Sequence, residues 1–335
     1  LFLPMSVLSM DKEEQRLLMQ IIAFHHERNY SLDEITPSLQ IMSEHHEELQ
    51  QKLKEEGFDT GFLTVKSIRR AIKSRYKIED DIFYRYVKLK GMLHRLDHAA
   101  SAHVPIEMHH HISVRNSVYR FFKEGGFKPN ELQQFAEKNR EKSVIVIAQT
   151  GMGKTEAGGI WIGDDKGFFT LPFRVSINAQ FDRSIHKLKL VDEKGAVAGL
   201  LHSGSLVVLE GYYEEGMDDI TDAYRQAQLL SRKLTFCTVD QILKFPFLFK
   251  GFEKWLATLS YSKLVIDEIQ AYSPKMLAVI LKALQMIHQV GGRFMIMTAT
   301  LPPIVFDTLE KMGIRKKEEY AMGTFVNDEK VRHRI

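Results

Sequence analysis

Residues 143–158 read SVIVIAQTGMGKTEAG, and their types and spacing suit the binding of a nucleotide's phosphates. The apolar start predicts a strand that is buried on both faces. Gly151 and Gly153 permit backbone angles that turn several N–H groups toward one phosphate chain, and a helix starting near Lys154 favours anions at its N-terminus. Lys154 would reach the β- and γ-phosphates, and the Thr155 hydroxyl would bind magnesium. The stretch therefore predicts a phosphate loop that binds ATP.

The alternative to a phosphate loop is an ordinary glycine-rich turn between a strand and a helix. The usual loop motif begins with a glycine, and this chain has Ala148 at that place. Gln133 precedes the strand, and its side-chain amide, with a donor and an acceptor, could read adenine or could simply face solvent. The residues expected to contact ATP are Gln133, Gln149, Thr150, Gly151, Met152, Gly153, Lys154, Thr155 and Glu156.

A second apolar run ends in two adjacent carboxylates, Asp267 and Glu268. Ligands of parallel sheets lie beyond the carboxyl ends of the strands, so these side chains are expected to face the phosphate loop. Asp267 would bind the magnesium of ATP, through water, and Glu268 would orient and activate the attacking water. An isolated Asp-Glu pair has no such meaning, but its combination with the loop does. The expected catalytic residues are Lys154, Asp267 and Glu268.

Short apolar strands alternate with helices across residues 111–335. This alternation predicts an α/β architecture, a parallel sheet with helices on both faces. At least six strands are expected, at residues 144–147, 167–171, 196–200, 234–237, 263–267 and 294–298.

The loops at the carboxyl ends of these strands contain groups that suit a nucleic-acid backbone. The residues expected to contact single-stranded DNA are Arg174, His202, Thr238 and Gln241. The segment Thr298-Ala299-Thr300 is expected to couple hydrolysis to movement of a second domain, unless Thr300 simply caps the next helix. The phenylalanine-rich residues 244–252 could stack on bases, although packing in the core or at a domain interface is favoured.

Residues 11–103 show helical spacing of apolar side chains, which predicts an all-α unit. Beyond a first helix that leads into residues 25–26, helices are expected near residues 39–55, 65–77 and 80–102. The inner face of the last is expected to contain Ile82, Tyr86, Met92, Leu93 and Leu96.

Three polar residues in this unit could carry a second chemistry. His25, His26 and Asp97 could together bind a hydrolytic transition metal, or could be separate side chains on solvent-exposed faces. The domain boundary is placed between residues 110 and 111, in a linker rich in histidine. The linker residues 109–111 are expected to be unstructured or at the surface rather than to form a site.

The composition predicts a cytoplasmic protein without a membrane partner. The 335 residues have a net charge of +3, which permits a nucleic-acid partner without requiring one. The single cysteine, Cys237, excludes an internal disulfide framework. No apolar run approaches the length of a membrane span, and the first ten residues lack the features of a signal peptide.

Five segments resemble superfamily two helicases and, more narrowly, the CRISPR-associated helicase–nucleases of type I interference systems. They are AQTGMGKTEA, LPFRVSINAQFDR, TVDQIL, VIDEIQAYSP and MTATLP. Members of this family carry an HD-type metal nuclease domain directly before the helicase. The resemblance implies the C-terminal part of such a helical domain at residues 1–110 and one RecA-like motor domain at residues 111–335. It also implies ATP with magnesium, a divalent transition metal for the nuclease, and an RNA-guided surveillance complex as a partner.

The resemblance assigns the family's paired-histidine motif to residues 25–26 and its closing Asp-x-x-x-Ser motif to Asp97 and Ser101. This chain departs from the family pattern in three places. It has no His-Asp dipeptide, it has Met5 near the place of a frequent histidine, and Gln270 replaces the common histidine after Asp-Glu. These departures put a complete metal centre in doubt.

The motifs together with this resemblance imply an ATP-dependent DNA helicase or translocase that is coupled to a metal-dependent nuclease and degrades foreign DNA. Only 35 residues follow Thr300, so a second motor domain, with the catalytic arginine that it would supply, is expected outside this chain, which would be an internal fragment. Two alternatives remain open. One is a different nucleic-acid-remodelling ATPase of superfamily two, and the other is a regulatory ATP-binding module that unwinds nothing.

Overall fold

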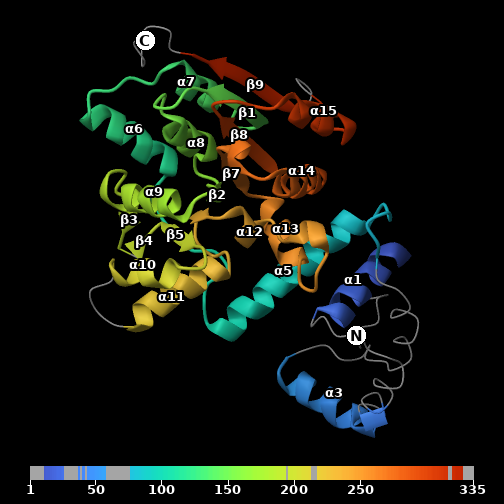
Figure 1. Cartoon of the computed structure of the whole chain (residues 1–335). Helices are drawn as coiled ribbons and strands as arrows, with labels where there is room; N and C mark the ends of the chain where they lie inside the picture. Colours follow the sequence, from blue (N-terminus) through green and yellow to red (C-terminus); the bar gives the residue numbers. More distant parts are fainter. Residues whose placement is uncertain are drawn as a thin grey trace, which may run out of the picture.

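A seven-stranded parallel sheet forms the centre of the molecule (Figure 1). The computed structural model describes residues 11–25, 37, 40, 41, 44–57, 76–193, 195–212, 217–315 and 319–326. In spatial order the strands are β5, β6, β2, β7, β8, β1 and β9. Their bounds are β1 (Ser143–Ala148), β2 (Gly167–Thr170), β5 (Ala198–Leu201), β6 (Leu234–Cys237), β7 (Lys263–Asp267), β8 (Arg293–Thr298) and β9 (Tyr320–Phe325). A separate antiparallel pair joins β3 (Val191–Asp192) to β4 (Gly195–Ala196).

Both faces of the sheet are buried. Successive side chains of a strand point to opposite faces, so neighbouring residues belong to different hydrophobic clusters. In β1, Ile145 belongs to one hydrophobic cluster, and Val144 and Val146 belong to another. In β7, Leu264 and Val265 divide in the same way. The first cluster packs against α1 (Lys12–Phe24), α5 (Phe83–Ala102), α12 (Val239–Ile242), α13 (Glu253–Leu259), α14 (Pro274–Gln289) and α15 (Pro303–Lys311). The second packs against α6 (Val114–Glu124), α7 (Glu131–Lys138), α8 (Lys154–Ile162), α9 (Arg174–His186), α10 (Ser205–Glu210) and α11 (Met217–Gln228).

The α/β architecture predicted from the sequence is confirmed. All six expected strands are present, with ends that differ by at most two residues. The seventh strand, β9, pairs in parallel with β1 and was not predicted. Its sequence, YAMGTF, includes a glycine and is mostly only half-buried, so it lacks the continuous apolar run that identifies the central strands.

The helix α5 lies directly against α13, so the helical N-terminal part and the sheet share one core (Figure 1). Gly91 permits this approach, because a Cβ there would lie 2.3 Å from the carbonyl oxygen of Glu253. Next to it, Lys90 and Glu253 form a buried ion pair at 2.7 Å. The prediction for the inner face of α5 is partly wrong: Tyr86 is buried as expected, but Leu96 is 53% exposed.

The linker after α5 is held to the sheet domain by side chains. Glu107 forms ion pairs with Arg95 at 2.7 Å and with Lys166 at 2.6 Å. Burial lowers the pKa of Lys166 to about 8, although Glu107 acts in the opposite direction. His110 is buried and lies 3.0 Å from Asp192, so the expectation that all three linker histidines lie at the surface is wrong.

The rest of the N-terminal part is described only in pieces. The helix α3 (His46–Glu55) overlaps the expected helix at residues 39–55 and has no buried residue. Most of the expected helix at residues 65–77 lies outside the described residues. None of the helices in the described part of the chain is long and apolar enough to cross a membrane.

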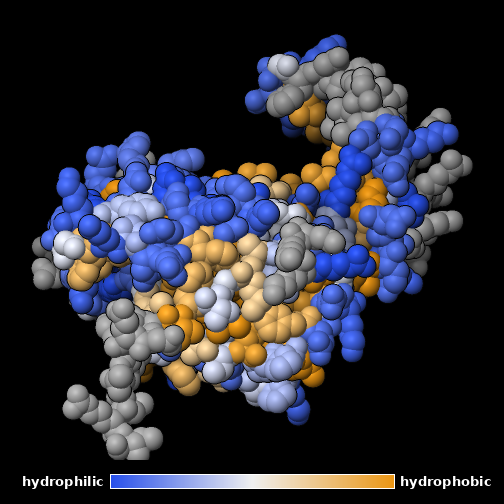
Figure 2. Space-filling view, turned by 90° about the horizontal axis from the view of Figure 1, so that it is seen from above, coloured by the Kyte–Doolittle hydropathy of each residue, from blue (hydrophilic) through white to orange (hydrophobic). Residues whose placement is uncertain are grey.

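Seen from above, the surface has an apolar area in its middle with polar side chains around it (Figure 2).

Candidate nucleotide-binding and hydrolysis site

The phosphate loop connects β1 to α8 and needs glycine at two positions. Gly151 and Gly153 have φ values of +80° and +78°, in the left-handed region that side chains disfavour. At Gly153 a Cβ would also lie 2.3 Å from the Nε2 atom of Gln133. Lys154 is then the first residue of α8, so the helix N-terminus faces the loop.

Gln133 supports this loop from α7 and is not solvent-facing. Asn130 and Gln133 form a reciprocal capping box at the start of α7. The Nε2 atom of Gln133 also donates to the carbonyl oxygens of Met152 at 3.2 Å and of Gly153 at 3.3 Å, and Asn130 donates to Met152 at 2.9 Å. The solvent-facing alternative is therefore wrong, and a contact between Gln133 and adenine stays a prediction.

Lys154 and Glu268 meet at the carboxyl ends of β1 and β7. The Nζ atom of Lys154 lies 2.6 Å from Oε1 of Glu268, although 114 residues separate them in the sequence. Glu268 has a φ of +52°, an uncommon conformation for a residue with a side chain. Its backbone N–H donates to the carbonyl oxygen of Met297 at 2.9 Å. The β7–β8 pairing thus fixes the turn that directs this carboxylate toward the loop.

Asp267 is buried at the end of β7. The pKa of its carboxyl group is raised to about 6, chiefly by burial, while the nearby Lys154 acts to lower it and the charge of Glu268 acts to raise it. A cation beside this carboxylate would compensate for its lost hydration. Carboxylate and hydroxyl oxygens suit magnesium, and Thr155 follows Lys154 at the start of α8, so the residues present fit a magnesium ion of bound ATP.

Gln270 joins the Asp-Glu turn to the expected coupling segment. Its Nε2 atom donates to Oε2 of Glu268, and its Oε1 atom accepts from the Thr298 hydroxyl. Thr298 is fully buried, and its hydroxyl lies 2.5 Å from the carbonyl oxygen of Thr300. The helix after this segment begins at Pro303 with Pro302 as its N-cap, so the alternative of a cap formed by Thr300 is wrong. The expected role of Thr298, Ala299 and Thr300 in coupling stays a prediction.

Sequence reasoning did not include Gln270 among the site residues. It appeared only as a departure from the family's usual histidine. Its position two residues after Glu268 was the available signal. Glu156, which was included, is buried in α8 and forms an ion pair with Arg183 of α9.

The residues expected to bind a nucleic acid lie shortly after the carboxyl ends of β2, β5 and β6, at the same edge of the sheet. Arg174 is exposed and donates to the Ser203 hydroxyl at 3.1 Å. Thr238 is the N-cap residue of α12, and Gln241 of the same helix donates to Asp240 at 2.8 Å. These placements are compatible with a strand of nucleic acid bound across this edge of the sheet, and the contacts with it stay predictions.

His202 differs from this group, because its ring is engaged inside the protein. Its Nδ1 atom accepts from the N–H of Gly204 at 3.0 Å, and its Nε2 atom donates to Oδ1 of Asn178 at 2.7 Å. Burial and the nearby Arg174 lower the pKa of this imidazole. The structure therefore does not support a direct phosphate contact by His202. It positions the loop at residues 202–205 instead.

The expected nuclease ligands are not brought together among the described residues. His25 lines a cavity of about 340 Å³ with His94 and His98, and Asp97 is not part of its lining. His26 lies outside the described residues. Within the described ranges, no group of three or more His, Cys, Asp or Glu side chains could hold a metal ion. The residues described here do not fit the implied transition metal.

Comparison with known proteins identifies the class to which this site belongs. The DEAD/DEAH box helicase family matches residues 130–308, which is more than half of the chain. The chain therefore belongs to that family, and its sheet with helices on both faces is RecA-like.

The more particular likeness is to Cas3 proteins. The CRISPR-associated nuclease/helicase Cas3 of Methanothermobacter thermautotrophicus is 31% identical over 234 residues, which cover 67% of this chain and 27% of that protein. A relative from Methanocaldococcus jannaschii with a corresponding name is 24% identical over 205 residues, or 58% of this chain and 28% of its own length. The resemblance expected from the sequence is confirmed, and the chain spans just over a quarter of the length of these relatives.

One solved structure that is similar to this chain is that of T. fusca Cas3 with ADP, with 21% sequence identity and a TM-score of 0.49. The similarity covers 59% of this chain and 24% of the T. fusca chain. A hypothetical ATP-dependent RNA helicase from Sulfolobus tokodaii is 16% identical with a TM-score of 0.43, covering 63% of this chain and 57% of that chain.

Proposed function

We propose that this chain contains the first, ATP-hydrolysing motor domain of a DNA translocase that works with a CRISPR-associated nuclease in the cytoplasm. The observation that supports this most directly is the contact between Lys154 and Glu268, 2.6 Å apart beside the buried Asp267. DEAD/DEAH box family membership supports the ATP-dependent motor. The nuclease and the association with CRISPR are inferred from the name of the M. thermautotrophicus relative. DNA as substrate and an RNA-guided complex as partner are what the family resemblance implies.

In the proposed cycle, the phosphates of ATP compete with Glu268 for Lys154. The loop N–H groups and Lys154 bind the phosphate chain, so Lys154 leaves the carboxylate that it contacts in this structure. Asp267 and the Thr155 hydroxyl would hold magnesium, and that ion would neutralise charge on the β- and γ-phosphates. Glu268 then accepts a hydrogen bond from the attacking water and takes its proton.

Gln270 is the group through which a change at Glu268 would reach Thr298. The Gln270 amide contacts both residues in this structure, through its nitrogen to Glu268 and through its oxygen to Thr298. Movement of the Glu268 carboxylate away from Lys154 would therefore change the position of the group that the Gln270 nitrogen contacts. The hydroxyl of Thr298 in turn contacts the backbone of Thr300, in the segment expected to move a second domain. This chain of contacts supports a coupling role for residues 298–300.

The nuclease half of the proposal rests on the relatives and on chain position. We treat residues 1–110 as the C-terminal part of a nuclease domain and residues 111–335 as the first motor domain. The described residues show His25, His94 and His98 around one cavity but do not form a metal centre. No step of the proposed ATP reaction depends on this region.

Nucleotide titration and steady-state hydrolysis of the chain, with and without single-stranded DNA, test the proposal. A Glu268→Gln variant should bind ATP and fail to hydrolyse it, because it retains the shape of the side chain and removes the base. The chain alone should turn over slowly, since an arginine that stabilises the transferring phosphoryl group contributes roughly 10³–10⁵-fold in related enzymes. Adding a second motor domain should accelerate turnover. ATP binding with no DNA-stimulated hydrolysis in that reconstituted enzyme would favour a regulatory module.

A further inference from the structure

The phenylalanine-rich segment after α12 divides into buried and exposed rings. Phe245 and Phe252 are buried in the core, as the packing interpretation predicted. Phe247 is 69% exposed and Phe249 is 37% exposed, on the turn between α12 and α13. Packing therefore explains only half of the aromatic residues in this segment.

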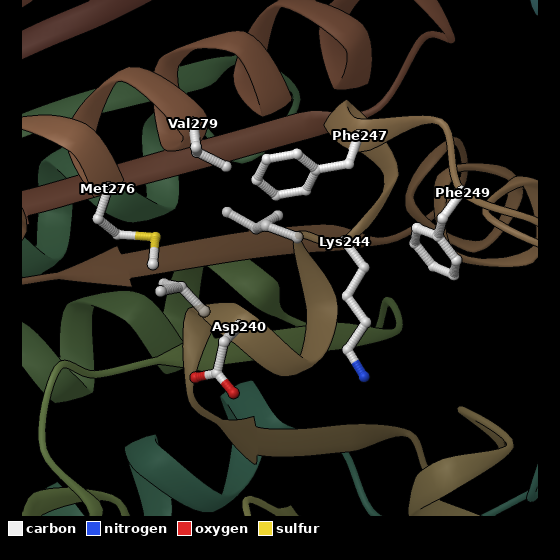
Figure 3. Close-up of a pocket in the computed structure, with 8 residues that line it drawn as sticks. Asp240, Lys244, Phe247, Phe249, Met276 and Val279 are labelled. Carbon is white, nitrogen blue, oxygen red and sulfur yellow. The ribbon is translucent and has the colours of Figure 1, made fainter.

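The exposed rings border a shallow apolar pocket of about 270 Å³. In Figure 3, Phe247, Met276 and Val279 point toward one another around this pocket, and the Asp240 carboxylate points away from it. That carboxylate also accepts from Gln241 at 2.8 Å. The pocket thus presents aromatic and aliphatic surface, with its one acidic group turned outward.

Trp255 extends this surface toward the histidine-lined cavity. Its ring contacts Phe249, with centroids 5.5 Å apart, and the ammonium groups of Lys244 and Lys254 lie 5.6 and 4.2 Å from its centroid. Lys250 and Lys254 line the cavity beyond it, together with His25, His94 and His98. We refer to six residues, Lys244, Phe247, Phe249, Lys250, Lys254 and Trp255, as the aromatic–lysine surface.

The charge of this surface is not balanced by the nearest acidic residue of α13. Glu253 is buried and pairs with Lys90 at 2.7 Å, so its charge is neutralised beneath the surface. Burial lowers the pKa of Lys254, and the neighbouring cations Lys244 and Arg95 lower it further. Cations held this close together would be stabilised by an anion with several charged groups.

Exposed aromatic rings interleaved with lysines form the type of surface that binds single-stranded nucleic acid, because bases stack on rings and phosphates pair with cations. We propose that the aromatic–lysine surface binds single-stranded DNA in this way. The surface starts at Lys244, just after α12, and the pocket beside it is also lined by Val239 and Asp240 of α12, whose N-cap is Thr238. The surface therefore continues the edge of the sheet at which contacts with a DNA strand are expected. This inference rests on the proposed DNA-dependent function and adds a binding site to it.

Fluorescence anisotropy with a labelled oligothymidylate of about fifteen nucleotides, titrated with the full chain, tests the inference. The triple variant Lys244→Ala, Lys250→Ala, Lys254→Ala should bind at least about tenfold more weakly at roughly 50 mM salt. Three lost phosphate contacts should also reduce the slope of log affinity against log salt by about 2. The single variant Phe247→Ala should lose about tenfold, with a salt slope like that of the parent chain.

The matched control carries the same change of net charge elsewhere. Lys123, Lys128 and Lys311 are exposed in other parts of the chain, so their replacement by Ala should reduce affinity far less than the first triple variant. Circular dichroism checks that each variant is folded. If both triple variants weaken binding equally, or if Phe247→Ala binds like the parent, the surface is not a DNA site, while the proposed function stands. A parent chain that hydrolyses ATP in the reconstituted enzyme but binds no single-stranded DNA would overturn both.

Discussion

The nucleotide site and the histidine-lined cavity are assembled in different ways. Asp267 ends β7, Glu268 follows it directly, and Lys154 follows the short loop after β1, so the order and register of β1, β8 and β7 place them within reach of one another. His25 lies after the end of α1, whereas His94 and His98 lie on α5 and the other side of the cavity comes from the α13 region. Here the positions depend on how separate helices pack.

This difference determines how tolerant each site is of sequence change. In the parallel sheet, backbone hydrogen bonds fix the strand ends, and the side chains beneath them can vary as long as they stay apolar. At the cavity, the approach of α5 to α13 requires Gly91 and buries the Lys90–Glu253 pair. A single substitution in that interface should therefore disturb the second region more than the first.

Breaking the buried pair gives the largest expected effect. Lys90→Ala should lower the free energy of unfolding by about 3–5 kcal/mol, because it leaves a buried carboxylate without its cation. The double variant Lys90→Met, Glu253→Leu should restore most of the loss. Replacing Arg225 of the exposed Arg225–Asp222 pair by Ala should cost less than about 1 kcal/mol. Urea unfolding monitored by circular dichroism measures all three.

The same experiment tests how independent the two regions are. Leu17, Ile21 and Phe83 share one hydrophobic cluster with the sheet, so a single unfolding transition is expected for the parent chain. Two separate transitions, with only the first shifted by Lys90→Ala, would show that the helices and the sheet form independent units and would weaken the comparison drawn here.

Removing the phosphate-loop lysine gives the next largest effect. Lys154→Ala should weaken ATP binding by a factor of about 100 or more, because it removes the cation that pairs with the β- and γ-phosphates. The exposed Lys187→Ala should bind ATP like the parent chain. Isothermal titration calorimetry with a non-hydrolysable ATP analogue is the measurement, and equal affinities for parent and Lys154→Ala would refute the phosphate-loop assignment.

The sequence predicted what depends on consecutive residues and missed what depends on tertiary packing. The six central strands could be predicted because buried parallel strands are continuous apolar runs, whereas β9 is half-buried and contains Gly323. The phosphate loop and the Asp-Glu pair are local motifs at strand ends. The buried face of α5 could not be predicted, since Lys90 is buried against Glu253 of α13 and His94 against the backbone of His25. The environment of His202 could not be predicted either, because one of its partners, Asn178, is on α9 and the other, Gly204, is reached only through the local turn.

Removing the negative charge of Glu268 should have a smaller effect, and one of opposite sign on binding. The Lys154–Glu268 pair is partly exposed, so it is worth about 1 kcal/mol, and ATP must displace it. Glu268→Gln should therefore bind the ATP analogue about fivefold more tightly while hydrolysis is lost. The same titration gives the comparison, with Glu124→Gln on the exposed surface as control. Weaker binding in Glu268→Gln would show that the pair does not compete with the phosphates.

The smallest effect concerns His202 and its dependence on pH. Its pKa is lowered in the folded chain, so it contributes stability above the unfolded pKa of about 6.5 that is lost as pH falls through the folded value. Protonation also removes the acceptor of the Gly204 N–H, a hydrogen bond of about 0.5–1.5 kcal/mol. Between about pH 7.5 and 5.5, His202→Asn should lose less stability than the parent chain, and the exposed His111→Asn should behave like the parent. If His202 instead contacted DNA phosphates, acidification would strengthen binding of single-stranded DNA in the parent but not in His202→Asn, and anisotropy at the two pH values distinguishes these outcomes.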